Sequence, residues 1–223
     1  RQYYSPNVES FIFRSYPFLF KSKIKKRNIK IFDFGCGEGS ALKHFVNNYN
    51  MEPYGVDISK SSIRECKKKL KLYKKNFSLI EPEPKKNRKF FNTKFDIIIA
   101  VQSLYYLSKY DLNILLNNLN KHLNKNGVVF FTMISTKHEY WQYYSNKKVN
   151  SDGLTEVDLR SDKNYLERYD QQSYTHFINF VKSEKDLKKK FNMFNILNIG
   201  EYTISLKDLK RSGHHYTIFA QKK

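Results

Sequence analysis

Three glycines within five residues mark the first place in this chain where chemistry could occur. Gly35, Gly37 and Gly39 alternate in the stretch IFDFGCGEGS (31–40), although the whole sequence has only eight glycines. Asp33 stands just before them. Glycine lets the backbone approach a ligand more closely than a residue with a side chain allows. An apolar strand, this loop and a following helix therefore predict a site where backbone N–H groups and a helix N-terminus contact a ligand.

The spacing and charge of the loop favour one class of nucleotide-like ligand. Dinucleotide-binding loops read G-x-G-x-x-G, whereas this loop reads G-x-G-x-G and has Ser40 where the third glycine would stand. The Asp33 carboxylate would repel a pyrophosphate but suits a cation. Asp57 ends the next expected strand, where a carboxylate can accept both ribose hydroxyls; its alternative role is to cap the following helix. A nucleoside that carries positive charge, such as S-adenosylmethionine with its sulfonium and ammonium groups, meets these demands.

Strand and helix patterns alternate around this loop. Apolar runs predict five strands, separated mostly by segments with helical periodicity, and this order is typical of a parallel sheet with helices on both faces. The strands are expected at 29–34, 53–58, 77–80, 95–101 and 128–135, and the helices at 40–49, 59–73 and 111–123. Ser62 with Glu65, and Ser108 with Asp111, have the spacing of helix caps. Asn126-Gly127 is expected to form a turn.

The end of the chain follows a different order. A helix from Ser183 to about Phe191 precedes two strands at 194–202 and 214–221, whose short link predicts an antiparallel hairpin. We therefore expect an α/β fold with a Rossmann-like seven-stranded sheet, mostly parallel with an antiparallel last strand. Residues 1–223 are expected to form a single domain, with 136–182 as an inserted lid or substrate-binding segment.

Composition limits the class of protein. No apolar run reaches the roughly 18 residues that a membrane helix needs, and no hydrophobic signal region is present. Cys36 and Cys66 are too few for a disulfide framework or a metal site, and Cys36 is expected to be a small buried filler. We therefore expect a cytoplasmic protein with neither a metal nor a membrane partner.

The net charge of +20 is compatible with a nucleic acid or another anionic partner. However, lysine is enriched together with asparagine, isoleucine, phenylalanine and tyrosine, all of which have AT-rich codons. A GC-poor genome would place lysines on solvated surfaces without a ligand. The lysine-rich runs lie at or near expected helix ends and loops, at 21–27, 67–75 and 188–190. Charge alone therefore does not decide the partner.

The glycine loop and the two acids resemble those of the class I S-adenosylmethionine-dependent methyltransferases. The family pattern DxGCGxG is met by Asp33, Gly35, Cys36, Gly37 and Gly39. Asp57 matches the family's acidic residue at the end of the second strand. The resemblance extends from about residue 10 to residue 223 and includes the order of elements with an antiparallel last strand.

This resemblance implies a cofactor, S-adenosylmethionine, and its product, S-adenosylhomocysteine. It also implies roles for individual residues. Asp33 and the loop backbone would hold the methionine part, Asp57 the ribose, and Ile58 would pack against the adenine. Glu81 or Glu83 would lie near the adenine amino group, although the sequence EPEP departs from the usual single Asp there. Gln102, after the fourth strand, would contact the methionine end.

Residues that could remove a proton from the methyl acceptor stand near the expected carboxyl edge of the sheet. His214 and His215 begin the last strand and point to opposite faces, so at most one is expected to face the site. Tyr106, or its neighbour Tyr105, follows the fourth strand. Each of these could instead be a packing or solvated residue. Further candidates are His138, Trp141 and Tyr143 as pocket or lid residues, and Tyr3 and Tyr4 as a segment closing over the cofactor.

The fourth strand lacks two motifs that would indicate a nucleic-acid substrate. It ends AVQSLYY, without the [DN]-P-P-[YF] motif of amino-directed nucleic-acid methyltransferases and without a Pro-Cys pair for attack on a pyrimidine. We therefore expect methyl transfer to an oxygen or nitrogen of a small molecule, with anionic or phosphorylated metabolites as the first candidates. The alternatives are an RNA methyltransferase that holds phosphates on lysine-rich faces, and a non-catalytic cofactor-binding partner subunit. A nicotinamide-dependent dehydrogenase ranks last because the third glycine is misplaced.

Overall fold

The structure is a computed structural model that describes residues 28–162, 174–206 and 211–223. Tyr3 and Tyr4, and residues 163–173 of the segment expected to be a lid, lie outside the described residues. In the described part of the chain, no helix is both long and apolar enough to cross a membrane.

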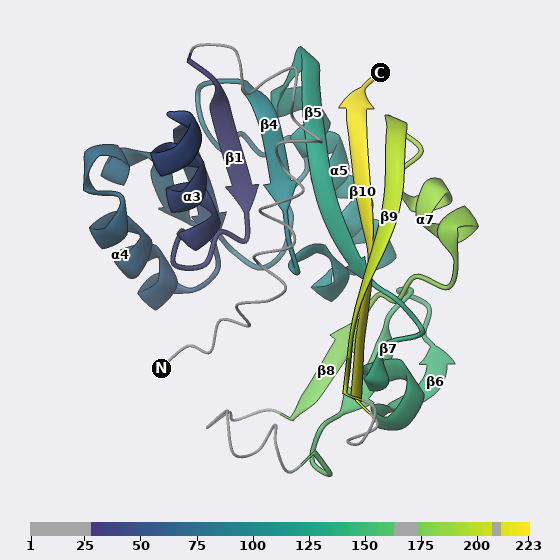
Figure 1. The fold of residues 1–223 in the computed structure, drawn as a ribbon. Coiled ribbons are helices and arrows are strands. Elements are labelled where there is room, and N and C mark those ends of the chain that lie inside the picture. The colour runs from purple at the N-terminus through teal and green to yellow at the C-terminus, as the bar shows by residue number, and fades with distance from the viewer. Residues whose placement is uncertain (1–27, 163–173, 207–210) are drawn as a thin grey trace.

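A central seven-stranded sheet organises the molecule (Figure 1), and it confirms the predicted Rossmann-like fold. Its strand order is β3-β2-β1-β4-β5-β10-β9. The first five pair in parallel, whereas β10 is antiparallel to both β5 and β9. The strands are β1 Lys30–Phe34, β2 Glu52–Asp57, β3 Phe77–Leu79, β4 Phe95–Ala100, β5 Leu123–Ile134, β9 Phe194–Leu206 and β10 Arg211–Lys222.

Helices cover both faces of this sheet, each over its own apolar cluster. On one face α3 (Ser40–Tyr49) and α4 (Lys60–Lys69) bury side chains such as Phe45 and Cys66 against β1 and β4. On the other face α5 (Lys109–His122) and α7 (Glu184–Lys190) pack on the cluster that contains Phe131. The near-continuous burial of β4 and β5 follows from this double cover, because both faces of a parallel sheet are packed.

The cap and turn residues in the sequence predict some ends of helices and strands correctly and others wrongly. Ser108 caps α5 by accepting the Asp111 backbone N–H at 3.0 Å, as its spacing predicts. The cap of α4 is Ser59, which accepts the Ser62 backbone N–H at 3.2 Å, so the predicted Ser62–Glu65 capping box is wrong. The predicted turn at 126–127 is also wrong, because β5 runs through these residues. Two 3-10 segments follow α4 and β4, namely η1 (Lys71–Asn76) and η2 (Leu104–Tyr106).

The segment expected to be a lid contains regular structure of its own. After the π-helical turn η3 (Tyr140–Tyr144), three antiparallel strands form a small sheet, beside the end of the main sheet where β10 begins (Figure 1). They are β6 Ser145–Val149, β7 Thr155–Asp158 and β8 Thr175–Ile178. Val157, Ile178 and Phe180 of this segment belong to the same buried cluster as Phe131 of the main sheet. The small sheet therefore shares a core with the main sheet.

Candidate active site

The glycine loop joins β1 to α3 at the carboxyl edge of the sheet, and its backbone needs glycine. Gly35, Gly37 and Gly39 have φ angles of 80°, 51° and 77°, in the left-handed region that side chains disfavour. A Cβ on Gly35 would lie 2.6 Å from the Ser103 Cβ, and one on Gly39 would lie 2.5 Å from the Cys66 Sγ. A Cβ on Gly37 would meet nothing within 4 Å. Close packing therefore requires glycine at positions 35 and 39. The middle glycine, Gly37, faces open space that a ligand can fill.

Asp57 ties this loop to the end of β2. One carboxylate oxygen accepts the Gly37 backbone N–H at 2.8 Å, and the other accepts the Ser59 backbone N–H at 2.8 Å. The carboxylate therefore lies directly beside the open face of Gly37. Each oxygen keeps further acceptor capacity, which suits the hydroxyls of a ribose. Since Ser59 provides the cap of α4, the cap alternative for Asp57 explains only one of its two hydrogen bonds.

Asp33 is a buried carboxyl group at the other side of the loop. Its side chain belongs to β1, and the residue is 4% exposed. Burial, together with the nearby Asp57 charge, raises the Asp33 pKa to about 8. A cation beside this group would favour its ionised form. Asp33 is therefore suited to hold a positively charged part of a ligand.

The residues predicted for the adenine end follow the neighbouring strands. Ile58 directly follows Asp57 and is 60% exposed, which leaves an apolar side chain free to pack against a ring. Glu81 lies in the exposed loop after β3, where it forms an ion pair with Lys85 that lowers the Glu81 pKa. Glu83, in the same loop, is exposed. Of these three, Ile58 has the strand-end position that the prediction requires.

The loop after β4 contains a strained residue. Gln102 has a φ of 55°, which is uncommon for a residue other than glycine and marks a backbone held by its surroundings. Its N–H donates to the Thr132 hydroxyl at 2.7 Å, and its side-chain amide donates to the Tyr202 hydroxyl at 3.4 Å. Next to it, the Ser103 hydroxyl donates to the Phe34 carbonyl at 2.8 Å and so joins this loop to β1.

The two adjacent histidines of β10 have separate surroundings. His214 Nδ1 lies 2.8 Å from the Ser135 hydroxyl, and its Nε2 lies 3.2 Å from a Glu201 carboxylate oxygen. This array resembles a Ser-His-acid triad, but Ser135 is 1% exposed and accepts the Lys137 backbone N–H, so its hydroxyl offers no accessible nucleophile. His214 thus has hydrogen-bond partners for both ring nitrogens.

His215 belongs to a group of aromatic rings. Its ring stacks on Tyr202 at 5.0 Å between centroids, stands perpendicular to His138 at 5.4 Å, and lies 5.9 Å from the Tyr105 ring. Its Nδ1 is buried and has no hydrogen-bond partner among the described residues. The Gln102–Tyr202 hydrogen bond links this group to the end of β4.

This group of rings is neutral at physiological pH. Burial, with smaller effects of His138 and His214, lowers the His215 pKa to about 3. Burial and His214 lower the His138 pKa to about 4. Burial also raises the Tyr202 pKa to about 12 and the Tyr105 pKa well above its usual value. The group therefore offers uncharged imidazole nitrogens and protonated phenols.

The other predicted acceptor-side residues lie around this group or in the small sheet. Tyr106 is 53% exposed, and its ring lies 4.6 Å from that of Tyr105. Trp141 packs on Phe180, and Tyr143 is exposed. The sequence analysis missed Tyr202, which reaches the site through the pairing of β9 with β10 opposite His215. The sequence alone does not indicate which residues of β9 and β10 stand opposite each other, so this contact could not be predicted.

Comparisons with known proteins agree with this geometry. Residues 4–196 match the profile of a family described as a methyltransferase domain. The chain belongs to this family. Its methyl donor is S-adenosylmethionine, and the open face of Gly37, the two carboxyl groups and the exposed Ile58 fit the parts of that molecule. The resemblance in the glycine loop is thus confirmed at the level of the family and its cofactor.

Individual relatives show how far the likeness extends. A ubiquinone biosynthesis O-methyltransferase of Pelagibacter ubique is 31% identical over 112 residues, which are 49% of this chain and 43% of that protein. The matched residues span 43%, 66% and 50% of the lengths of three curated relatives. A Clostridium acetobutylicum S-adenosylmethionine-dependent methyltransferase has a TM-score of 0.64 at 16% identity, covering 97% of this chain and 98% of that chain. A Methanosarcina mazei methyltransferase of this kind has a TM-score of 0.65 at 14% identity, covering 91% and 96%. These structural likenesses concern the fold.

Proposed function

We propose that this methyltransferase transfers the methyl group to an oxygen or nitrogen atom of a small metabolite, with His215 facing the acceptor. The observation that carries the proposal is the buried Nδ1 of His215, which has no hydrogen-bond partner among the described residues; Tyr202 and Gln102 link its ring to the end of β4. A buried polar nitrogen without a partner is costly, and a ligand hydroxyl or amine would satisfy it.

The cofactor residues have distinct roles in this proposal. Asp33 holds the ammonium of the methionine part beside the loop backbone, and Asp57 accepts the ribose hydroxyls. Ile58 packs against the adenine, with Glu81 in the loop that borders it. Gln102 contacts the methionine end from the strained loop after β4. Gly35 and Gly39 keep the loop in a shape that exposes the Gly37 backbone.

The protein contributes mainly orientation to the reaction. S-adenosylmethionine supplies a methyl carbon activated by sulfonium, which passes to the acceptor lone pair as the carbon–sulfur bond breaks and S-adenosylhomocysteine forms. His215 is fully neutral at pH 7 and can accept a hydrogen bond from the acceptor, which aims the lone pair. The burial that keeps this imidazole neutral also makes it a weak base. It can therefore take the proton only once methyl transfer has moved the positive charge from sulfur to the acceptor oxygen or nitrogen, whose proton is then strongly acidic.

The rings around His215 favour a particular kind of acceptor. Tyr105, His138 and Tyr202 surround this imidazole with aromatic and neutral groups, which suits a compact and largely apolar acceptor. The partly similar Pelagibacter protein is named as an O-methyltransferase, which favours oxygen as the methylated atom. Tyr106 is exposed beside Tyr105 and would contact the rest of the acceptor in this proposal.

A labelling experiment tests this proposal. The protein is incubated with S-adenosylmethionine carrying a tritiated methyl group and with phenols, amines, phosphorylated metabolites or bulk RNA. We expect label on a small acceptor and none on RNA. His215→Asn should reduce turnover of that acceptor by about a hundredfold or more, with S-adenosylhomocysteine affinity unchanged. His44→Asn, a histidine substitution in α3, is the matched control. Label on RNA alone, or full turnover by His215→Asn, would contradict the proposal.

A further inference from the structure

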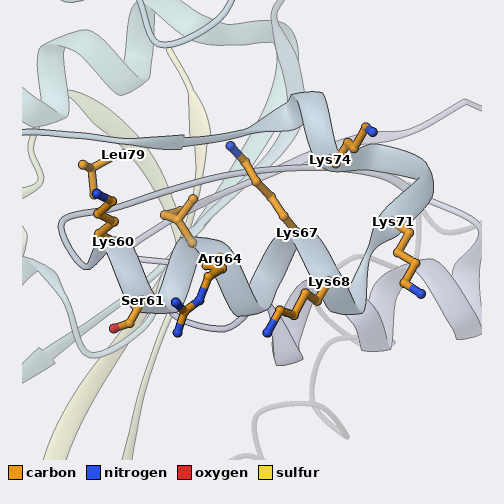
Figure 2. Close-up of a pocket in the computed structure, with 9 residues that line it drawn as sticks. Lys60, Ser61, Arg64, Lys67, Lys68, Lys71, Lys74 and Leu79 are labelled. Atoms are coloured by element: carbon orange, nitrogen blue, oxygen red, sulfur yellow. The ribbon is translucent and has the colours of Figure 1, made fainter.

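A groove lined by basic side chains runs along α4 and η1, away from the rings around His215. It has a volume of about 1090 Å³. Its lining contains six basic side chains and no acidic one among the described residues. The lining comprises Lys60, Ser61, Ile63, Arg64, Lys67, Lys68, Lys71, Lys74 and Leu79. Figure 2 shows Lys60 and Leu79 together at one end of this basic groove, with Lys71 and Lys74 at the other.

The helical period gathers these charges on one face. In α4, positions 60, 64, 67 and 68 follow the i, i+4, i+7, i+8 spacing of one helix stripe, and Lys71 and Lys74 continue the row at i, i+3 spacing in the 3-10 segment η1. The apolar residues of α4, Ile63 and Cys66, are buried against the sheet. The helix therefore uses its apolar face for the core and presents an almost entirely cationic face to the groove.

Most of these charges have no carboxylate partner in the part of the chain that the structure describes. Arg64 and Lys68 share Glu65, with nitrogen–oxygen distances of 3.6 and 2.9 Å. Lys67, Lys71 and Lys74 are exposed and have no carboxylate within 4 Å among the described residues. Mutual repulsion of these ammonium groups would be relieved by a bound polyanion.

We propose that the basic groove binds the sugar-phosphate backbone of single-stranded RNA. One row of cations at about one per helical turn, or about 5.4 Å, suits a single chain of regularly spaced phosphates. The net charge of +20 would attract such a chain from a distance. Single-stranded polynucleotide in a cell is overwhelmingly RNA. This binding goes beyond the proposed methyl transfer and does not require RNA to be the acceptor.

A membrane surface fits the groove less well. Helices that lie on lipid bury an apolar face beside their cations. In α4 that face is already packed, and across α4 and η1 the described residues include one strongly exposed apolar side chain, Leu72 at 94%. The groove also has no aromatic lining residue, so contact is expected with phosphates and not with stacked bases.

The test measures binding of a fluorescently labelled 20-nucleotide RNA of mixed sequence to the full chain across a range of KCl concentrations. The groove variant combines Lys67→Gln, Lys71→Gln and Lys74→Gln. The matched control combines Lys125→Gln, Lys148→Gln and Lys185→Gln, three exposed lysines outside the groove lining. Each lost phosphate contact should lower the slope of log affinity against log salt by about 0.7. We expect the groove variant to lose about two units of slope and to bind at least about tenfold more weakly, with the control close to the unchanged protein.

Three results would overturn the proposal. An equal loss in both triple variants would show that the charge acts diffusely. Tighter binding of a DNA strand of the same sequence would remove the RNA assignment. Groove-dependent pelleting with phosphatidylglycerol vesicles, without RNA binding, would assign the groove to a membrane. S-adenosylhomocysteine titration of the groove variant separates these results from failure of the cofactor site. The single variant Lys71→Gln, with an expected slope change of about 0.7, keeps the test valid if the triple variant does not fold.

Discussion

Asp33 is a buried residue whose proposed contact with the cofactor would make cofactor binding depend on pH. The group is nearly enclosed, and burial together with Asp57 raises its pKa to about 8. At neutral pH the free protein therefore holds a proton on Asp33. In the proposed site, the ammonium group of the cofactor would favour the carboxylate, so we expect binding to release that proton.

The resulting prediction concerns S-adenosylhomocysteine, which has the ammonium group but transfers no methyl. Its binding at pH 7 should release about 0.9 of a proton, and its affinity should rise as the pH increases from 6 to 8. Calorimetry in buffers of different ionisation enthalpy measures this release. Asp33→Asn, which has no proton to lose, should bind more weakly and release almost none. Identical heats in all buffers for the unchanged protein would show that Asp33 is already ionised.

At the residue scale, the sequence predicts groups that follow one another in the chain and misses groups that depend on distant pairing. The positions of Asp33 and Asp57 beside the glycine loop could be predicted because each stands at or next to the end of a strand, and their roles in holding the cofactor stay predictions. Tyr202 could not, because it meets His215 only through the register of β9 with β10. Tyr106 was predicted as a catalytic candidate, but its neighbour Tyr105 is the one buried beside His215.

At the element scale, glycine is needed in the glycine loop for two reasons, the backbone conformation and close packing. All three glycines have positive φ angles, but only Gly35 and Gly39 are also closely packed. A side chain at position 37 would enter open space beside Asp57. The loop therefore separates residues that maintain its structure from the residue that leaves room for a ligand.

Two alanine substitutions distinguish these requirements. Gly39→Ala should lower the free energy of unfolding by roughly 3 kcal/mol, since its Cβ would overlap the Cys66 sulfur at an already unfavourable φ. Gly37→Ala should cost about 1 kcal/mol from its φ angle alone, while weakening S-adenosylhomocysteine binding at least about tenfold. Urea denaturation and calorimetry measure the two effects. Equal loss of stability in both variants would contradict this division.

The elements themselves were predictable where their apolar pattern is strong. Strands β1 and β4 were expected because both faces of each are buried by helices. The three strands of the small sheet were missed. The first, β6, reads SNKKV and is largely exposed, so no alternation of apolar residues marks it, and β7 and β8 are only four residues long each. The α4 cap was misplaced because four consecutive residues, 59–62, include three serines, and only the structure shows that Ser59 bonds the Ser62 N–H.

At the scale of the whole molecule, Asn179 joins the small sheet to the main sheet. It is fully buried, and its backbone N–H donates to the Tyr105 carbonyl at 2.8 Å. Its side-chain amide donates to the Leu107 carbonyl at 3.2 Å, and its side-chain oxygen accepts from the Lys190 ammonium at 2.8 Å. The segment after β8 is thereby attached both to the loop after β4 and to α7. The role of residues 136–182 as a lid stays a prediction.

Substitution of Asn179 should reveal this junction. Asn179→Ala would leave the half-buried Lys190 ammonium without its amide acceptor and the Leu107 carbonyl without its donor. We expect the free energy of unfolding to fall by about 2–3 kcal/mol in urea denaturation. Asn47→Ala, at an exposed position of α3, should change it by less than about 0.5 kcal/mol. Equal effects of the two substitutions would show that Asn179 does not hold the two sheets together.

The central claim of this account is that the loop and Asp57 form the cofactor site, and calorimetric titration with S-adenosylmethionine and S-adenosylhomocysteine tests it most directly. We predict that both bind the unchanged protein. Asp57→Ala should weaken both by about tenfold to a hundredfold, the effect of losing hydrogen bonds to a charged group. Asp152→Ala, at an exposed carboxylate in the small-sheet segment, should bind both normally. Absence of binding by the unchanged protein, or equal affinity of Asp57→Ala, would contradict the account.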